Sequence, residues 1–580
     1  MLHLKMGERA MAIFALAMAA LFCVVAGGSS ATAQPLPAAT TAATATQPTA
    51  SAAAATLLRA PEPNPKRGGI LQWAGLSDSP HFDMHQCDTA ACAMPQSPFF
   101  DTLVRYSPFD GGKEILPDLA YKWEVSDDGL TYTFHLRDGV KFHDGATLTA
   151  EDVKATFDRI IFPPTGMISP RRGTFEGVTE VKAVDPKTVQ FILKAPRGTL
   201  LAAIASGWNV IERKKTLEDN HFDLKKVKPG TRAHPGTGPF ILDSHQAGEF
   251  WKLKRNPDYW NPALPYLDGI QFNQLPYGPA TGAALLTGRV DYVYGAGGDL
   301  RDTIKAKYAT THTVVVYPTP SLGSGYINHE RAPFGDARVR RAISMIMDRC
   351  AIKEAVAAIR EIEVGTWVIP NDPYGPAYRE ATLGQKPGYS CPTSAADIAT
   401  AKQLLADAGY PDGRGFPKVD IMVRDINFLV APMAPMIQAF MKQRLNIESA
   451  IRVVHTSVWL EDQAKGNYTI GINGNPATLP VAADYWKKWF MTGSGGNWNR
   501  GASHPEFDAL LQQLAAESDP VKAKALVQRG AEILEEWSPM LALMHFTIID
   551  AWSNSVKGHG RAHRQDLFND NRFDTVWLDK

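Results

Sequence analysis

The stretch TYTFHLRDGVKFHDGATLTAEDV, residues 131–153, decides how the N-terminal half of this chain is built. Polar and apolar residues alternate at its start, which is the period of a strand with one buried face. Gly139 and Gly145 each follow an aspartate and indicate tight turns, because glycine adopts a positive φ at little steric cost. Thr149 and Asp152 form a capping box. The stretch therefore predicts two strands joined by a turn, followed by a helix that begins just after Thr149.

The same stretch holds four residues whose side chains can ligate metals or transfer protons, namely His135, Asp138, His143 and Asp144. Imidazoles and carboxylates so close together could ligate a metal or act as an acid/base pair. Strand alternation, however, places both histidines on the polar face between glycine turns, and no third ligand follows at a useful spacing. We interpret the cluster as the solvent-directed edge of a hairpin, without catalytic or metal-binding function.

Length and charge restrict the class of protein. A chain of 580 residues is unusually long for one compact domain, so two or three lobes are expected. Lysine plus arginine and aspartate plus glutamate both number 60, so the formal net charge is zero. Such a balance provides no long-range attraction to nucleic acid or to anionic lipid.

Helical and β-rich stretches alternate along the chain, which predicts a mixed α/β fold.

The N-terminus is typical of an exported protein. Lys5 and Arg9 precede an apolar run and then a small-residue motif that ends at Ala33. This order describes a secretory signal over residues 1–33, cleaved before Gln34. The apolar run is shorter than the ~20 residues that a membrane-spanning helix needs. We therefore expect a protein that is released into the periplasm.

Two further features belong to this region. A lipoprotein would require lipid attachment at Cys23, but Phe22 is a poor fit to the small residue that should precede it. Residues 34–65 are rich in alanine, threonine and proline, and such a composition buries too little apolar surface to order the backbone. This segment is predicted to be a disordered tether.

Four of the five cysteines lie beyond the signal, at Cys87, Cys92, Cys350 and Cys391. An even number in an oxidising compartment allows two disulfides. Cys87 and Cys92 are close enough to pair across a turn, which leaves Cys350 with Cys391. Zinc is a poorer alternative, because C-x4-C has no second pair at a matching spacing.

Other stretches predict individual elements. The periodicity of ARVRRAISMIMDRCAI (337–352) predicts one helix that runs from an Asp336 cap through Cys350. Ser394 starts a capping box, and Asp519 with the following proline opens another helix. The apolar run LALMHFTII (541–549) predicts a buried strand.

Catalytic signatures are absent from the sequence. It contains no G-x-S-x-G, H-E-x-x-H, Walker or G-x-G-x-x-G motif. This absence favours binding over catalysis, and we expect no catalytic residue, cofactor or metal. The alternatives are a secreted α/β hydrolase or isomerase, and a sensory or chaperone protein that does not serve transport.

Several stretches together resemble one family, the peptide- and nickel-type periplasmic solute-binding proteins of ABC importers (extracellular solute-binding protein family 5). They occur in the family's order along the mature chain. They are FDTLVRYSP (100–108), LPDLAYKWEVSDDGLTYTFHLRDGVKFHDGATLTAEDVKATFDRI (116–160), GTGPFILDSHQAGEFWKLKRNPDYWNPALPYLDGI (236–270), GRVDYVYG (288–295), RAPFGDARVRRAISMIMDR (331–349) and AKQLLADAGYPDGRGFPKV (401–419).

The resemblance implies an α/β fold, a two-lobed type II-like clamp with an extra subdomain on the first lobe. The first lobe would comprise residues 66–317 and 540–580, and the second lobe residues 318–539. A small-molecule solute would bind between the lobes, which close by hinge motion. A monomer would then deliver the solute to the transmembrane subunits of an ABC permease.

One departure concerns the solute. In peptide-binding relatives a Gly-Trp-x-x-Asp segment supplies the aspartate that pairs with the peptide α-amino group. When Gly474 is aligned with that glycine, Asn475 replaces the tryptophan and Thr478 replaces the aspartate. Asp484 is a candidate substitute, and Tyr485 falls on the family's aromatic position.

The resemblance implies further residues that line the cleft. The loop after the first strand would contribute His85 and Gln86, with His85 as a conceivable ligand of a nickel complex. The remaining candidates are Ser324, Tyr326, Trp367, Asn473 and Trp486. For Trp486, as for Trp489, a place in the core is the alternative.

Overall fold

The computed structural model describes most of the chain after the N-terminal segment. The described residues are 57–75, 78–87, 90–110, 114–275, 278–357, 362–424, 432–477, 479, 481–494, 497–517, 519–560 and 570–580. The expected signal peptide and the first part of the tether lie outside these ranges. Within them, no helix combines the length and the apolar character needed to cross a bilayer.

An 11-stranded sheet organises the structure, in the order β15-β14-β16-β12-β17-β11-β1-β10-β9-β8, with β13 paired to β17. Its strands are β1 (Ile70–Gly75), β8 (Phe240–Gln246), β9 (Phe250–Arg255), β10 (Gly269–Gln274), β11 (Tyr292–Val293), β12 (His312–Ile327), β13 (Ile362–Val364), β14 (Val419–Arg424), β15 (Ser449–Val454), β16 (Ile470–Pro476) and β17 (Met540–Ser553).

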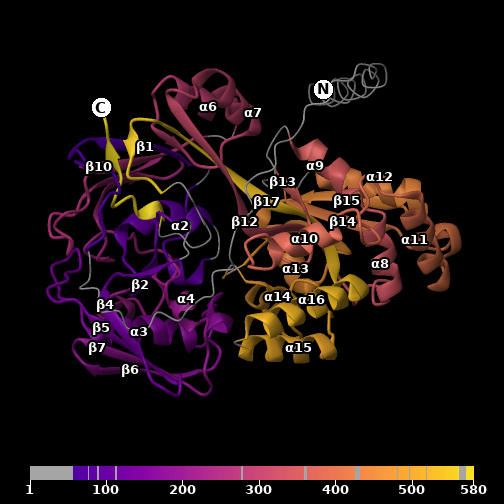
Figure 1. Ribbon diagram of the computed structural model, residues 1–580, viewed down its shortest axis with the longest axis horizontal. Coiled ribbons are helices and arrows are strands. Elements are labelled where there is room, and N and C mark those ends of the chain that lie inside the picture. The colour runs from indigo at the N-terminus through magenta and orange to yellow at the C-terminus, as the bar shows by residue number, and fades with distance from the viewer. Residues whose placement is uncertain are drawn as a thin grey trace. The chain divides into compact units, whose positions relative to one another are not determined.

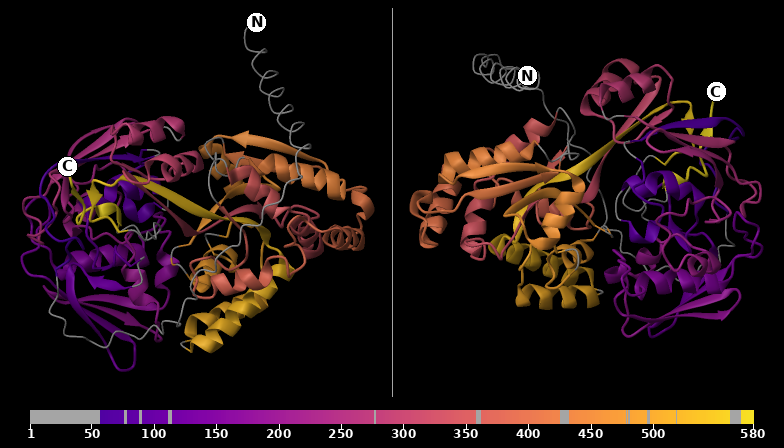
Figure 2. Two further views of the ribbon diagram at one scale, coloured as in Figure 1. Left: turned by 45° about the horizontal axis from the view of Figure 1, so that its top comes forward. Right: turned by 180° about the vertical axis from the view of Figure 1, so that it is seen from behind.

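Two long strands connect the part of the sheet that holds β1 with the part that holds β14 (Figure 1). Strands β12 and β17 pair antiparallel from His312↔Ser553 to Tyr326↔Met540. The same crossing is visible from behind in Figure 2. Nearly all of β17 is buried, which confirms the strand predicted from the apolar run. A strand buried on both faces is apolar along most of its length.

The first lobe carries a separate 4-stranded sheet in the order β4-β5-β7-β6, which lies at the lower left of Figure 1. Its strands are β4 (Ala120–Val125), β5 (Thr131–Leu136), β6 (Val178–Asp185) and β7 (Thr188–Leu193). Helix α3 (Ala150–Ile161) covers it, and the rings of Phe157 and Phe191 meet edge to face at 4.8 Å. We call this sheet and its helices the subdomain.

The structure confirms most of the prediction for residues 131–153. Strand β5 ends at Leu136, and the Thr149–Asp152 capping box opens α3. The prediction of a second strand is wrong, because this part of the chain forms only an isolated bridge between Lys141 and Thr147. The solvent-directed placement of His143 is also wrong, because its ring lies between the backbones of Gly236 and Gly238.

The hairpin residues have structural partners. The Asp144 carboxylate pairs with Arg213, and the His135 imidazole lies 3.5 Å from Glu124. Both pairs are formed within the first lobe. These contacts agree with an architectural role for the stretch.

The first lobe also contains short elements, including two small two-stranded sheets, β2-β3 and β18-β19. They are η1 (Met84–Gln86), α2 (Ala90–Gln96), η2 (Ser97–Phe99), β2 (Val104–Tyr106), β3 (Ile115–Pro117), η3 (Arg172–Phe175), α4 (Leu200–Ile204), α5 (Lys214–Asp219), α6 (Pro279–Leu286), α7 (Gly298–Thr303), η4 (Ile304–Tyr308), β18 (Val556–Lys557), η7 (Asp570–Arg572) and β19 (Trp577–Leu578).

Helices flank the second-lobe strands. They are α8 (Ala337–Met345), α9 (Arg349–Ala357), α10 (Gly375–Thr382), α11 (Ala395–Asp407), η5 (Pro411–Gly413), α12 (Met433–Leu445), α13 (Thr456–Lys465), α14 (Ala482–Phe490), α15 (Pro505–Ala516) and α16 (Pro520–Trp537). Ser394 and Asp519 cap α11 and α16 as predicted. The single helix expected through Cys350 is wrong, because α8 ends at Met345 and Cys350 belongs to α9.

Residues 57–65 of the expected tether are packed against the first lobe. Leu58 lies against an apolar cluster that includes Tyr266 and Trp577, and its carbonyl accepts a 3.0 Å hydrogen bond from Asn261. The Glu62 carboxylate accepts a bond from the Gly558 amide at 3.1 Å. The prediction of disorder as far as residue 65 is therefore wrong in this part, because these side chains find apolar and polar partners.

Candidate functional site

The loop after β1 is tied down by a buried ion pair. Asp83 caps η1 by accepting from the His85 and Gln86 amides, and its carboxylate lies 2.5 Å from the Arg159 guanidinium of α3. Both side chains are inaccessible to solvent. The Arg159 charge and its hydrogen bonds hold the pKa of Asp83 well below its usual range, although burial alone would raise it.

His85 is occupied by this network. Arg159 approaches Nδ1 at 2.9 Å and Nε2 lies 2.9 Å from the Val210 carbonyl. Because arginine only donates, Nδ1 accepts and Nε2 carries the proton. Burial, followed by the Arg159 charge, lowers the pKa of His85 to about 4. His85 is therefore a neutral core residue in the described structure, and its proposed role as a nickel-complex ligand has no support.

Gln86 also points into the network, since its Nε2 donates to the Asp83 carboxylate at 2.8 Å. This bond holds the side chain against the loop. The position expected to face a solute thus stabilises the loop itself.

The four candidates on β12 and β16 lie on one face of the sheet. Ser324 donates to the Asn475 side-chain oxygen, and the Tyr326 hydroxyl donates to the Gly474 carbonyl at 3.1 Å. Asn473 stands opposite Ser324 in the strand register. The four side chains are buried beside an apolar cluster that includes Trp459 and Trp489. All four are buried polar groups inside the second lobe, and their expected role in lining the cleft stays a prediction.

The aromatic side chains of α14 also form core. Trp486 is fully buried, and its indole donates to the Trp367 carbonyl at 2.8 Å. Trp367 packs edge-on against Phe490. Trp486 and Trp489 therefore lie in the core, which was the alternative to a place in the cleft. The ring of Trp367 is buried in the same core.

Tyr485 differs in its hydroxyl. The residue is fully buried, and among the described residues its OH has no hydrogen-bond partner. Burial raises the pKa of Tyr485 well above its usual value, so the hydroxyl retains its proton. An unsatisfied buried donor is unusual in native structures and requires an explanation.

Asp484 is engaged on two sides. One carboxylate oxygen accepts a 2.9 Å hydrogen bond from the Leu479 amide, which closes the turn that precedes α14. The Asp484 charge also acts on Arg197 of the subdomain: burial lowers the pKa of Arg197, and Asp484 opposes that shift. Thr478 itself lies outside the described residues.

A polar group that the sequence did not indicate surrounds an irregularity in the β12–β17 pairing. The register shifts between Pro318 and Leu322, and Thr319 donates to the Phe546 carbonyl at 3.1 Å. His545 Nε2 accepts from the Thr366 amide at 3.0 Å, and burial lowers the pKa of His545 to about 3.

Asn371 joins the same group. Its Nδ2 donates to the Pro318 carbonyl at 3.2 Å, while its Oδ1 is buried without a partner among the described residues. The only sequence signal for this place was the Pro318-Thr319-Pro320 interruption of a β pattern.

The second lobe touches the subdomain at the turn before α14. Leu479 belongs to the apolar cluster of the subdomain and is 2 % exposed, and Val481 packs against the same cluster. Lys487 of α14 forms an ion pair with Glu176, which follows η3. These contacts join segments far apart in the sequence.

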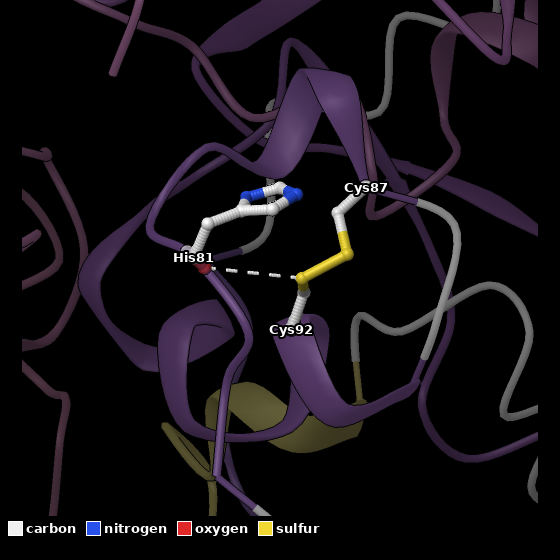
Figure 3. A group of neighbouring side chains, drawn as sticks. All are labelled: His81, Cys87 and Cys92. Carbon is white, nitrogen blue, oxygen red and sulfur yellow. Dashed lines mark hydrogen bonds between the residues drawn. A yellow bond between two sulfur atoms is a disulfide. The ribbon is translucent and has the colours of Figure 1, made fainter. Parts of the chain in front are cut away.

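Both predicted disulfides are confirmed, Cys87–Cys92 and Cys350–Cys391. His81 lies beside the first of them, so that three potential metal-ligating atoms are within 4.8 Å of one another (Figure 3). Both sulfurs are covalently joined, and a thiolate is the form that binds metal. In this oxidised state the group is a disulfide with a neighbouring imidazole.

Comparisons with known proteins agree with this architecture. Residues 114–497 match the sequence model of the bacterial extracellular solute-binding proteins, family 5. The dipeptide-binding protein of Escherichia coli K12 is 28% identical over 499 residues, which cover 80% of this chain and 86% of that protein.

Solved structures show the same two-lobed fold. A Helicobacter pylori periplasmic binding protein in complex with the peptide STSA has a TM-score of 0.74 at 24% identity, covering 89% of this chain and 99% of that one. A binding protein of A. tumefaciens R10 in complex with agropinic acid has a TM-score of 0.74 at 22% identity, covering 88% and 99% of the two chains.

Proposed function

Because the chain belongs to family 5 of the bacterial extracellular solute-binding proteins, we propose that it captures a small organic solute between its lobes and delivers it to the permease of an ABC importer. The family match over residues 114–497 is the observation that carries this proposal. The family consists of binding proteins, so the protein releases its solute chemically unchanged. The working form is a monomer in the periplasm that carries no cofactor.

The lobes meet at the two long strands. We assign residues 66–317 and 540–580 to the first lobe and residues 318–539 to the second. The first boundary falls within β12 and the second at the start of β17, and the register shift after Pro318 interrupts the pairing of these strands close to the first boundary. An interrupted ladder bends more readily than a regular one, so this place is suited to a hinge.

We expect the solute to lack a free α-amino group, because Thr478 stands in the sequence where peptide-binding relatives have an aspartate. Thr478 offers a neutral hydroxyl, whereas an ammonium ion removed from water requires an anionic partner. Asp484 is already held by the Leu479 amide and is influenced by Arg197. Blocked peptides, other amides and hydroxylated organic acids fit this condition.

Two buried polar atoms could form hydrogen bonds with such a solute. The Tyr485 hydroxyl is a donor and Asn371 Oδ1 an acceptor, and each lacks a partner among the described residues. We propose that both atoms face the solute, and a solute that carries an acceptor and a donor would then satisfy them. The observation favours an amide or a hydroxy acid.

The test begins with the solute that the exported protein retains. Mass spectrometry of gently purified protein should find a small organic compound without a free α-amino group, and calorimetry should confirm reversible binding. Tyr485→Phe should weaken binding, whereas Tyr410→Phe, at a partly buried tyrosine packed against α11, serves as the matched control. A solute converted to product during incubation would contradict the proposal.

A further inference from the structure

The contact between the turn before α14 and the subdomain joins the two lobes through protein groups alone. Leu479 is almost completely buried in the apolar cluster of the subdomain, together with Val481 at its edge. Burying a leucine side chain is strongly favourable, and here the gain requires the lobes to be in contact. No part of this contact needs a solute.

An ion pair and a second interaction between opposite charges accompany the apolar contact. Lys487 forms an ion pair with Glu176, with the two side chains 27% and 55% exposed. The Asp484 charge acts on Arg197, where it opposes the lowering of the Arg197 pKa by burial. In each pair one partner comes from α14 and the other from the subdomain.

Arg197 links the two pairs. Its Nη1 donates to the Glu176 carbonyl at 2.7 Å, and its Nε donates to the Thr199 hydroxyl at 2.9 Å. The guanidinium therefore fixes the backbone of Glu176 while its charge acts on Asp484. The subdomain side of the contact is preorganised.

The second-lobe side is fixed as well. Asp484 holds the Leu479 amide at 2.9 Å, and the buried Asp372 carboxylate holds the Ala482 amide at 2.6 Å. Because both partners are already ordered, little conformational entropy is lost when they meet.

We propose that Leu479, Lys487 and Asp484 with Glu176 and Arg197 form a solute-independent latch that holds the lobes closed before a solute binds. This inference rests on the proposed function, because a latch matters only if the lobes open and close around a solute. Its test does not, because closure is measured without a solute. A latch that favours the closed state raises the population of closed protein, and the solute then needs to contribute less to closure.

The experiment measures closure without any solute. Asp138 and Val521 are exposed residues of the first and second lobe, with exposures of 97% and 76%. Fluorophores on Asp138→Cys and Val521→Cys report the distance between the lobes, because the described native cysteines are in disulfides. The protein is stripped of solute by unfolding and refolding with its disulfides intact.

The expected result is a closed population that falls about two- to five-fold in Lys487→Glu or Glu176→Lys, the effect of an exposed ion pair. The double variant Lys487→Glu/Glu176→Lys should recover closure. Leu479→Ala should shift the equilibrium about ten-fold toward the open state. Salt at 1 M should weaken the charge contribution in the wild type.

The control variant is Lys215→Glu, which breaks an ion pair with Asp219 inside α5 and should leave closure unchanged. Open solute-free protein that is insensitive to these variants would overturn the latch. So would equal loss of closure in the single and double charge variants. Neither result depends on the identity of the solute, so failure of the latch is distinguishable from failure of the proposed function.

Discussion

The Asp484 carboxylate accepts a 2.9 Å hydrogen bond from the Leu479 amide, five residues before it in the chain. Through this bond the Asp484 side chain becomes part of the turn that precedes α14. The charge of Asp484 also acts on Arg197 of the other lobe. The only close substitute for the missing amine-binding aspartate thus already has two partners.

Ordinary di- and tripeptides are therefore expected to bind poorly. A threonine hydroxyl provides a neutral hydrogen bond worth ~1 kcal/mol, whereas a charge-assisted bond contributes about two or three times as much. Isothermal calorimetry should show weaker binding of a free tripeptide than of its N-acetylated form. Tight peptide binding that disappears in Asp484→Asn would instead place the amine site at Asp484.

Removing the buried partner of Arg159 should destabilise the first lobe. Asp83→Ala leaves a guanidinium buried without its carboxylate, which typically costs about 3–5 kcal/mol. Urea unfolding followed by tryptophan fluorescence measures the change. Asp219→Ala, at the exposed pair with Lys215, should cost less than about 1 kcal/mol. Equal effects of the two substitutions would refute the structural role given to Asp83.

His545 should make the protein sensitive to acid. Its pKa is lowered to about 3 by burial, whereas an unfolded histidine titrates near 6.5. As the pH falls below 6.5, the unfolded chain binds a proton that the native state does not bind, so this residue lowers the free energy of unfolding. The cost is about 1.4 kcal/mol per pH unit and stops growing near the native pKa.

The comparison of wild type with His545→Gln isolates this effect, because other titrating groups contribute to both proteins. The stability of the variant relative to wild type should improve steadily between pH 6.5 and 4.5. Guanidinium unfolding curves at several pH values provide the measurement. A difference that stays constant with pH would show that His545 is not buried in its neutral form.

The two disulfides should contribute unequally. Cys350–Cys391 spans 41 residues and Cys87–Cys92 spans 5. In the chain-entropy account the longer loop constrains the unfolded state more, by about 2 kcal/mol. Thermal unfolding of Cys350→Ala/Cys391→Ala and Cys87→Ala/Cys92→Ala should show the larger loss in the first double variant. The reverse order would indicate strain or residual structure in one of the loops.

The exported protein should begin at or near Gln34, because the small-residue motif ends at Ala33. Intact mass measurement on material secreted by its native host tests this directly. A chain that begins at Cys23 with an attached lipid would establish a lipoprotein instead.

Local pattern sufficed for much of the architecture. The alternation in β5, the helix caps at Thr149 and Ser394 and the mostly apolar run of β17 each depend on neighbouring residues, and each was predicted correctly. The order of the family stretches identified the two-lobed fold, which the solved relatives share. Cysteine spacing indicated both disulfides.

Sequence could not decide which polar residues are available to a partner, because that depends on contacts between distant segments. His85 was a reasonable ligand until Arg159, 74 residues away, was found against its Nδ1. In the same way, no local pattern indicated that Ser324 donates to Asn475, 151 residues further along the chain.

The contact between the lobes shows most clearly what the sequence determines and what only the tertiary structure decides. By itself the sequence determined that Leu479 is apolar, that Asp484 and Lys487 are charged, and that a helix can include the latter two. Only the tertiary structure decided that Lys487 pairs with Glu176, because these two residues lie 311 positions apart in the chain. Hydrophobic burial and charge pairing are set by proximity in space, and no local pattern encodes that proximity.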